Sequence, residues 1–344
     1  MTKLTGEQVE AILGRKIQNK QASESETDVS FSDVDNFGDI ESLKEMFTDI
    51  AKYNKMLGER ISFINDALSS AIPFTRENLY VIAAYSGSGK STIAANISFP
   101  LWKQAKKSLV ISNEESQQDV LFRIGCLELG YSFNDYKKGV MSLDKQKEVM
   151  KLFPEIAKYV KVLDVNYKAG LTTKLEGVKN ALTAVKESDY SCAMIDYYQL
   201  IQYSVQDKSR SRYDVLNDLR IWLGQYIKNS NIPIVLFAQL HSIGKRNNKD
   251  LDSRIKECPG VIEPATVILE VVPNFEDRTS EFIIHKDRFG FAGHKVTCAF
   301  DKGRFVKLTN EHKEKMMSKK LNDLTKEIVE DSKERQEEDL SVDL

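Results

Sequence analysis

A glycine-rich turn between an apolar run and the start of a helix constrains this sequence more than any other feature. The run from Leu79 to Ala84 leads into Tyr85-Ser86-Gly87-Ser88-Gly89-Lys90-Ser91-Thr92, which is followed by I-A-A-N-I-S. This order fits G-x-x-x-x-G-K-[ST] at every position except the first, where Ala84 replaces glycine. Small residues let backbone N–H groups converge on phosphates at a helix N-terminus, while a lysine contacts the β- and γ-phosphates and a hydroxyl binds Mg²⁺. Residues 84–92 therefore predict a nucleotide site in which Lys90 and Ser91 have these two roles.

Acidic residues end two further apolar runs, and a phosphate loop of this kind needs carboxylates for its metal and its attacking water. The run Cys192-Ala193-Met194-Ile195 ends in Asp196, as in a buried strand whose terminal carboxylate faces the metal. The run Leu109-Val110-Ile111-Ser112-Asn113 ends in Glu114 and Glu115, of which one is a candidate general base and the other a solvated residue at a helix start. The expected cofactors are ATP and Mg²⁺, with Ser91 and Asp196 at the metal.

The spacing of the apolar runs predicts an α/β fold. Five short runs are separated by helix-length segments, which is typical of buried parallel strands joined by crossover helices; they are 79–84, 108–112, 160–165, 192–196 and 232–238. Four later runs follow one another too closely for crossover helices and predict antiparallel hairpins added to the sheet; they are 266–272, 280–286, 296–300 and 305–308. The expected core is a mostly parallel sheet with an antiparallel extension.

The two ends of the chain differ from this middle region. Residues 21–39 are acidic, serine-rich and poor in aliphatic side chains, which predicts a linker after a short helix at 6–20. Residues 40–57 repeat apolar side chains at three- and four-residue steps, the pattern of an amphipathic helix that Gly58 ends. The expected domains are a short helix and acidic linker at 1–38, a second helix at 39–57, an ATPase domain at 58–311 and a charged tail at 312–344.

Composition excludes several other classes of protein. The 344 residues include 49 Lys and Arg against 51 Asp and Glu, so the net charge of −2 does not attract the whole molecule to nucleic acid, and any such binding depends on local patches. No apolar run approaches the ~18 residues of a membrane helix, and the first residues resemble neither a signal nor a transit peptide, so we expect a cytoplasmic protein without membrane contact. The four cysteines show no C-x-x-C spacing, which argues against a zinc site or a disulfide framework.

Five motifs in this order resemble those of the DnaB family of replicative helicases, within the RecA-like ring ATPases. Besides the phosphate loop they are S-L-V-I-S-N-E-E-S, A-M-I-D-Y-Y-Q-L-I, P-I-V-L-F-A-Q-L-H-S and F-I-I-H-K-D-R-F-G. The resemblance implies a RecA-like core with Glu114 as the catalytic glutamate. It also implies that Gln239 senses the γ-phosphate, and that Lys286 and Arg288 reach into the ATP site of a neighbouring subunit.

The same resemblance implies a ring of six subunits that hydrolyses ATP, moves 5′ to 3′ along single-stranded DNA and unwinds duplex. The helix at 40–57 matches in position the family's linker helix, which docks on the adjacent protomer. DNA contacts are expected from two loops, one after Asp196 and one after Gln239, whose basic residues are Lys208, Arg210, Arg212, Lys245, Arg246 and Lys249. A loader, primase or polymerase is an expected partner, for which the acidic tail at 327–344 resembles a docking peptide.

The chain also departs from the family pattern. Its first 57 residues are short and acidic where the family has a large helical domain, which suggests a phage or other mobile element as the source. The family's R-E-S-G-S-I-E stretch, which lies near its DNA-binding loops, occurs here only as K-E-C-P-G-V-I-E.

Two other functions fit part of the sequence. A RecA-like recombinase or a circadian-clock-type ring ATPase shares the phosphate loop and Asp196 but lacks the K-x-R-x-G strand. A non-motor loader or regulator would bind ATP as a structural ligand, against which the acids Glu114 and Glu115 and the intact Gln239 argue. Strand exchange without unwinding would favour the first alternative.

Overall fold

A computed structural model describes residues 63–166, 171–186, 189–203, 211–241, 251–257, 259–314 and 317–318, all within the unit Leu57–Leu344. The helices and linker expected before residue 63 and the acidic tail at 327–344 lie outside these residues. Among the helices that are described, none has the length and apolar character that crossing a membrane requires.

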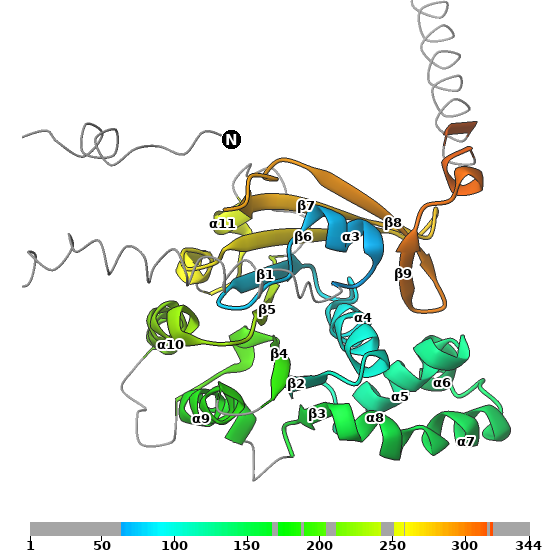
Figure 1. Cartoon of the computed structure of the whole chain (residues 1–344), viewed down its shortest axis with the longest axis horizontal. Coiled ribbons are helices and arrows are strands. Elements are labelled where there is room, and N and C mark those ends of the chain that lie inside the picture. The colour runs from blue at the N-terminus through cyan, green and yellow to red at the C-terminus, as the bar shows by residue number, and fades with distance from the viewer. Residues whose placement is uncertain are drawn as a thin grey trace, which may run out of the picture. The chain divides into compact units, whose positions relative to one another are not determined.

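Nine strands of the described residues form one sheet in the order β3-β2-β4-β5-β1-β6-β7-β8-β9 (Figure 1). They are β1 Leu79–Ala84, β2 Lys107–Ser112, β3 Val160–Leu163, β4 Tyr190–Asp196, β5 Ile234–Gln239, β6 Val267–Asn274, β7 Thr279–Asp287, β8 Lys295–Asp301 and β9 Arg304–Lys307. Every expected strand is present, and its ends differ from the expectation by two residues or fewer. Strands that are covered on both faces need apolar side chains at successive positions, which is why they stand out in the sequence.

Strand pairing confirms the mostly parallel core and refines its border. The strands from β3 through β2, β4, β5 and β1 to β6 are all parallel to their neighbours. From β6 onwards, β7, β8 and β9 each pair antiparallel with the preceding strand. The run at 266–272 thus begins the antiparallel hairpins, as expected, but it also adds a further parallel strand beside β1. Its close spacing to the next run indicates the hairpin and carries no information about the neighbour on its other side.

The helices of the described residues connect and cover these strands. They are α3 Asp66–Ala71, α4 Lys90–Lys103, α5 Gln117–Leu129, α6 Phe133–Lys137, α7 Leu143–Lys151, α8 Phe153–Tyr159, α9 Leu175–Lys186, α10 Arg212–Tyr226 and α11 Leu251–Arg254. Short 3₁₀ turns occur at η2 Leu171–Thr173, η3 Tyr198–Leu200, η5 Ile227–Asn229 and η7 Pro259–Ile262. Serine side chains accept backbone N–H bonds at the starts of α5, α6 and α10, where Ser116, Ser132 and Ser211 stand.

Apolar side chains pack on both faces of the sheet. On one face, Tyr80 and Ile82 of β1 belong to a core that includes residues of α3, α4, α5 and α8. On the other face, Leu79 and Val81 belong to a core with α9 and α10. Figure 1 shows these two groups of helices on opposite sides of the parallel strands. Because successive side chains of a strand point to opposite faces, each central strand contributes to both cores.

The carboxyl ends of the central parallel strands lie at one edge of the sheet. Ala84 of β1 is in register with Gln239 of β5, and Ser112 of β2 with Asp196 of β4. In open parallel sheets, ligands bind outside this edge. The fold therefore brings the phosphate loop, the acids after β2 and β4, and Gln239 to the same place.

Candidate nucleotide-binding site

The phosphate loop connects the end of β1 to the start of α4. Gly87 and Gly89 have φ angles of 75° and 89°, which residues with a Cβ adopt only with strain. Lys90 is the first residue of α4, so the N–H groups at this helix start are directed toward the loop. The Nζ of Lys90 lies 3.5 Å from the carbonyl of Tyr85, and only 6% of Lys90 is exposed. The turn thus gathers one cation and several N–H donors at the edge of the sheet.

Ser91 and Asp196 form the candidate metal position. Asp196 is 2% exposed, and its carboxylate accepts a hydrogen bond from the Ser91 hydroxyl. Burial raises the pKa of Asp196 to about 6, although the hydrogen bond and the charge of Lys90 act to lower it. Within the described part of the chain, Asp196 Oδ1 is buried and has no hydrogen-bond partner. A buried carboxylate oxygen without a partner, next to a serine hydroxyl, fits the oxygen ligands that Mg²⁺ prefers.

Charges of both signs surround the Lys90 ammonium. Burial lowers the pKa of Lys90, the carboxylates of Asp196 and Glu114 oppose this shift, and the charge of Lys256 adds to it. The backbone N–H of Lys256 donates to the carbonyl of Gln239 at 3.1 Å, which ties the segment 251–257 to the end of β5. Lys256 is therefore a second cation close to the site. The sequence analysis gave Lys256 no role. Its position at the start of K-E-C-P-G-V-I-E, the counterpart of a family stretch near the DNA-binding loops, was the one indication that it could be functional.

The two acids after β2 have different surroundings. Glu115 forms an ion pair with Arg123 of α5, and 18% of its side chain is exposed. Arg123 also donates to the hydroxyl of Thr92 at 3.0 Å, so the ion pair is connected to the first turn of α4. Glu114 is exposed and lies close enough for its charge to raise the pKa of Lys90. Glu115 is thus held in an ion pair by Arg123, whereas the side chain of Glu114 is exposed to solvent near the phosphate loop.

Gln239 ends β5 directly opposite the start of the phosphate loop. Its backbone N–H donates to Oε1 of Gln199 at 3.1 Å, and its carbonyl accepts from Nε2 of the same residue at 3.0 Å. Gln199 lies in η3 after β4 and is 2% exposed. This buried amide holds the ends of β4 and β5 together. Sequence reasoning missed it, although it belongs to the quoted motif A-M-I-D-Y-Y-Q-L-I.

Lys286 and Arg288 lie at the opposite edge of the sheet. Strand β7 runs antiparallel to β6, and the N–H of Arg288 donates to the carbonyl of Thr266 at 3.1 Å. The N–H of Thr266 donates to the carbonyl of Leu79, which begins β1. Since a strand rises by ~3.3 Å per residue, the start of β1 is about 17 Å from its end at the phosphate loop. The structure therefore does not bring this pair to the phosphate loop of the same chain.

Of the six basic residues expected to contact DNA, Arg212 is the one within the described residues. It begins α10, forms an ion pair with Glu257 and donates to the carbonyl of Gln199. The chain that follows the first basic loop thus meets the chain that follows the second. The others lie outside the described residues; they are Lys208, Arg210, Lys245, Arg246 and Lys249.

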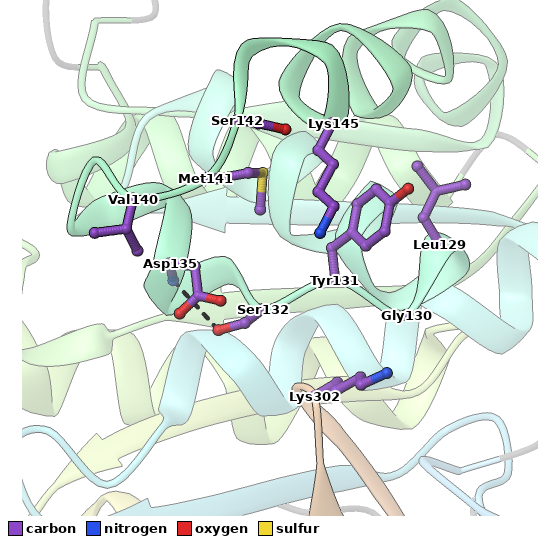
Figure 2. Close-up of a pocket in the computed structure, with 10 residues that line it drawn as sticks. All are labelled: Leu129, Gly130, Tyr131, Ser132, Asp135, Val140, Met141, Ser142, Lys145 and Lys302. Carbon is purple, nitrogen blue, oxygen red and sulfur yellow. Dashed lines mark hydrogen bonds between the residues drawn. The ribbon is translucent and has the colours of Figure 1, made fainter.

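Two cavities lie near the carboxyl-terminal half of α5. One, of about 640 Å³, is lined by residues that include Gly87 and Gly89 of the phosphate loop and Phe275 and Arg278 of the turn after β6. The other, of about 440 Å³, is lined by residues of α5 through α7 and by Lys302, whose side chain comes from the β8–β9 turn (Figure 2). The phosphate loop thus lines the first cavity, and none of its residues lines the second.

A phosphate loop after the central parallel strand β1, a buried aspartate at the end of β4 two strands away, and an antiparallel extension are together typical of a RecA-like domain. The profile of the DnaB-like helicase C-terminal domain matches residues 66–310. The chain therefore belongs to the DnaB-like helicases, as its five motifs predicted. No curated protein matches the chain.

Solved structures share this fold. An ATPase domain matches with a TM-score of 0.59 and 18% identity, over 82% of this chain and 100% of that one. A DnaB-like replicative helicase, described together with its interactions with primase, matches with a TM-score of 0.60 and 19% identity, over 79% of this chain and 67% of that one. The RadB recombinase matches with a TM-score of 0.47 and 13% identity, over 72% of this chain and 100% of that one.

Proposed function

We propose that this chain is an ATP-dependent replicative DNA helicase that works as a ring of identical subunits. One observation carries the proposal: the phosphate loop and the Lys286–Arg288 pair, to which the family resemblance gives a role at a neighbour's ATP, lie at opposite edges of the same sheet. Lys90, Ser91 and Asp196 are at the carboxyl edge, whereas Lys286 and Arg288 are at the other. A single chain cannot close such a site on itself, but a neighbouring copy can complete it.

This separation determines the kind of assembly. The edge of one copy that carries Arg288 would contact the edge of the next copy that carries Lys90, which is a heterologous interface. Such interfaces generate either a closed ring or an open helical filament. The family favours a ring of six, with ATP at each interface, and hydrolysis would loosen one interface at a time.

The residues at the carboxyl edge of the sheet are suited to ATP hydrolysis. When bound between Ser91 and Asp196, Mg²⁺ would neutralise charge on the phosphate oxygens. Lys90 contacts the β- and γ-phosphates, and the exposed carboxylate of Glu114 orients the attacking water and takes its proton. Arg288 of the neighbouring copy stabilises the charge that develops on the transferred phosphoryl group.

The cavity beyond the loop accounts for the rest of the nucleotide. Its lining also includes Phe275, which is 78% exposed, and Arg278. An aromatic ring and a guanidinium in the lining of the same cavity suit a nucleobase, because the π-face of the base can contact either group.

Gln239 and its neighbours connect hydrolysis to the DNA-binding side. The side-chain amide of Gln199 holds the backbone of Gln239. The backbone carbonyl of Gln199 accepts a hydrogen bond from Arg212, which follows the first basic loop. A change at the γ-phosphate that shifts Gln239 would therefore move the chain next to both basic loops. We expect these loops to bind the DNA backbone without regard to sequence, because they offer cations for phosphates.

Several finer features belong to this proposal. They are travel from 5′ to 3′, a phage or mobile-element source, a cytoplasmic location and contact with a loader, primase or polymerase. The amphipathic helix at 40–57 would dock on the adjacent subunit, and the acidic tail at 327–344 would be kept away from the DNA by its charge.

The test combines two measurements on one preparation of the full chain. ATP hydrolysis is measured with and without single-stranded DNA, and unwinding is measured on forked duplexes whose 5′ or 3′ arm is blocked. We expect DNA-stimulated hydrolysis and unwinding that a block on the 5′ arm abolishes, with Lys90→Ala as the inactive control. Strand exchange without unwinding would favour a recombinase, and ATP binding without hydrolysis would favour a loader or regulator.

A further inference from the structure

A cluster of charged side chains is buried next to the phosphate loop. Both oxygens of Glu270 on β6 accept hydrogen bonds from the guanidinium of Arg254, at 2.8 and 2.5 Å. His285 of β7 is hydrogen-bonded to the same carboxylate at 2.8 Å. Arg254 is 8% exposed and Glu270 3% exposed. Ile255, which follows Arg254, and Ile268, two residues before Glu270, both belong to the apolar core on this face of the sheet.

A contribution to stability is by itself a weak reason for burying these charges there. Removing two charges from water is unfavourable, and replacing a buried ion pair by apolar residues of similar volume is often neutral or stabilising. A bidentate arginine–carboxylate pair does, however, fix the geometry of what it connects. The arrangement therefore indicates a positioning role, and the question becomes which parts of the chain the pair joins.

On one side the pair reaches the phosphate loop. The guanidinium of Arg254 also donates to the hydroxyl of Tyr85 at 3.3 Å. Tyr85 is the second residue of the loop, and its carbonyl lies 3.5 Å from the Nζ of Lys90. Glu270 itself is in register with Ala83, two residues before Tyr85. A displacement of Arg254 would thus be felt at the residue that borders the phosphate-binding lysine.

On the other side the pair holds the chain that follows the second basic loop. Arg254 is the last residue of α11. Its backbone carbonyl accepts a hydrogen bond from the N–H of His241 at 2.8 Å, which joins the chain before residues 242–250 to the chain after them. Lys256 and Glu257 follow within the same segment, and Glu257 pairs with Arg212 after the first basic loop. The segment 251–257 is therefore joined to both places where we expect DNA to bind.

We propose that Arg254 and Glu270 are positioning residues that couple the phosphate loop to the DNA-binding side of the motor. When DNA shifts the segment 251–257, Arg254 transmits the shift to the Tyr85 hydroxyl and so to the site of the phosphates. The inference rests on the proposed function, because it requires that both nucleotide and DNA bind. Gln239 and Gln199 already provide one connection between the nucleotide site and the basic loops. Arg254 and Glu270, which none of the five motifs contains, would provide a second.

The experiment compares two variants of the full chain with wild type. Glu270→Gln keeps the shape of the side chain and removes its charge, and the double variant Arg254→Met with Glu270→Met replaces the pair by apolar side chains. The matched control is Lys103→Met with Glu128→Met, which removes a partly exposed ion pair at 2.8 Å between α4 and α5. The readouts are kcat and KM for ATP with and without an oligo-dT strand, and the affinity for that strand with and without a non-hydrolysable ATP analogue.

We expect both variants to lose most of the stimulation by DNA, measured in each variant as the ratio of kcat with the strand to kcat without it. By linkage, the analogue should also stop changing the affinity for DNA, where coupled sites typically change it about 5- to 150-fold. The control should retain both effects. A purely structural role would lower thermal stability and leave the ratio of stimulated to basal kcat unchanged.

Each other outcome is decisive. Wild-type stimulation in a folded double methionine variant would overturn the inference and leave the helicase function intact. The double variant also serves if Glu270→Gln does not fold, and failure of the double variant itself to fold would reject the positioning role in favour of a structural one. Wild type without any stimulation by DNA would instead reject the proposed function, and the inference with it.

Discussion

Arg123 of α5 holds the carboxylate of Glu115 in an ion pair and contacts the first turn of α4 through Thr92. The preceding residue, Glu114, is exposed and acts through its charge on Lys90. Two adjacent acids that look equivalent in the sequence therefore have different partners in the fold. One is part of the scaffold around the phosphate loop, and the other is exposed to solvent close to Lys90.

Glu114→Gln should abolish turnover while nucleotide binding remains. Loss of a general base typically lowers the rate about 10²- to 10⁴-fold, whereas a glutamine leaves the shape of the site unchanged. Lys90→Ala, in contrast, should weaken binding itself, because the cation that contacts the phosphates is lost. Steady-state hydrolysis and fluorescence titration with a labelled nucleotide measure the two effects. Near-normal kcat in Glu114→Gln would reject this assignment and turn attention to Glu115.

Arg123→Met should destabilise the protein, because it leaves the carboxylate of Glu115 with little exposure and without its cation. Breaking one partner of a buried ion pair costs about 3–5 kcal/mol, and the partial exposure of this pair places the expected loss toward the lower end. Urea unfolding measures the loss. Glu115→Gln, measured beside it, should retain more kcat than Glu114→Gln, and the reverse order would contradict the different roles of the two acids.

Mixing Arg288→Ala subunits with Lys90→Ala subunits should restore part of the ATPase activity. Each variant alone lacks one half of every site, and an arginine finger is typically worth about 10³-fold or more in kcat. A mixed ring contains some interfaces at which both halves are intact, so hydrolysis should rise above the sum of the two separate samples. Demonstrably mixed rings without any gain would place Arg288 outside a shared site.

Acid should weaken the protein in part through Glu270. Burial alone raises the pKa of Glu270, but hydrogen bonds from His285 and Arg254 outweigh it and lower the pKa to about 2, from 4.5. A carboxyl whose pKa is lower in the folded state stabilises the protein above pH 4.5, and this contribution is lost as the pH falls toward 2.

Glu270→Gln should therefore show a shallower fall in its free energy of unfolding across that window, by at most about 3 kcal/mol. Urea unfolding at a series of pH values between 2 and 5 checks this, with the partly exposed Glu281→Gln on β7 as the charge-matched control. A wild-type slope in Glu270→Gln would show that the carboxyl titrates alike in both states.

Much of the fold could be read from local patterns. A strand that is covered on both faces needs successive apolar residues, so β1 to β5 stand out as short runs between helix-length segments. The phosphate loop is equally visible, because the positive φ angles of Gly87 and Gly89 and the cation and hydroxyl of Lys90 and Ser91 all fall within one short segment. Features whose residues are adjacent in the chain, such as a buried strand or a phosphate loop, can be recognised as motifs in the sequence.

What the tertiary structure alone decided are the pairings between distant residues. The parallel neighbour of β6, the ion pair that takes Glu115, the Gln199 amide on Gln239, and the contact of Arg254 with Glu270 and Tyr85 join positions that no spacing rule connects. The pattern of apolar residues in a sequence predicts that a side chain is buried, but it does not predict which other side chain it contacts. Polar residues such as Glu270 and Gln199 lie in apolar surroundings only because the fold supplies their partners, and these partners become visible only when the strands are assembled.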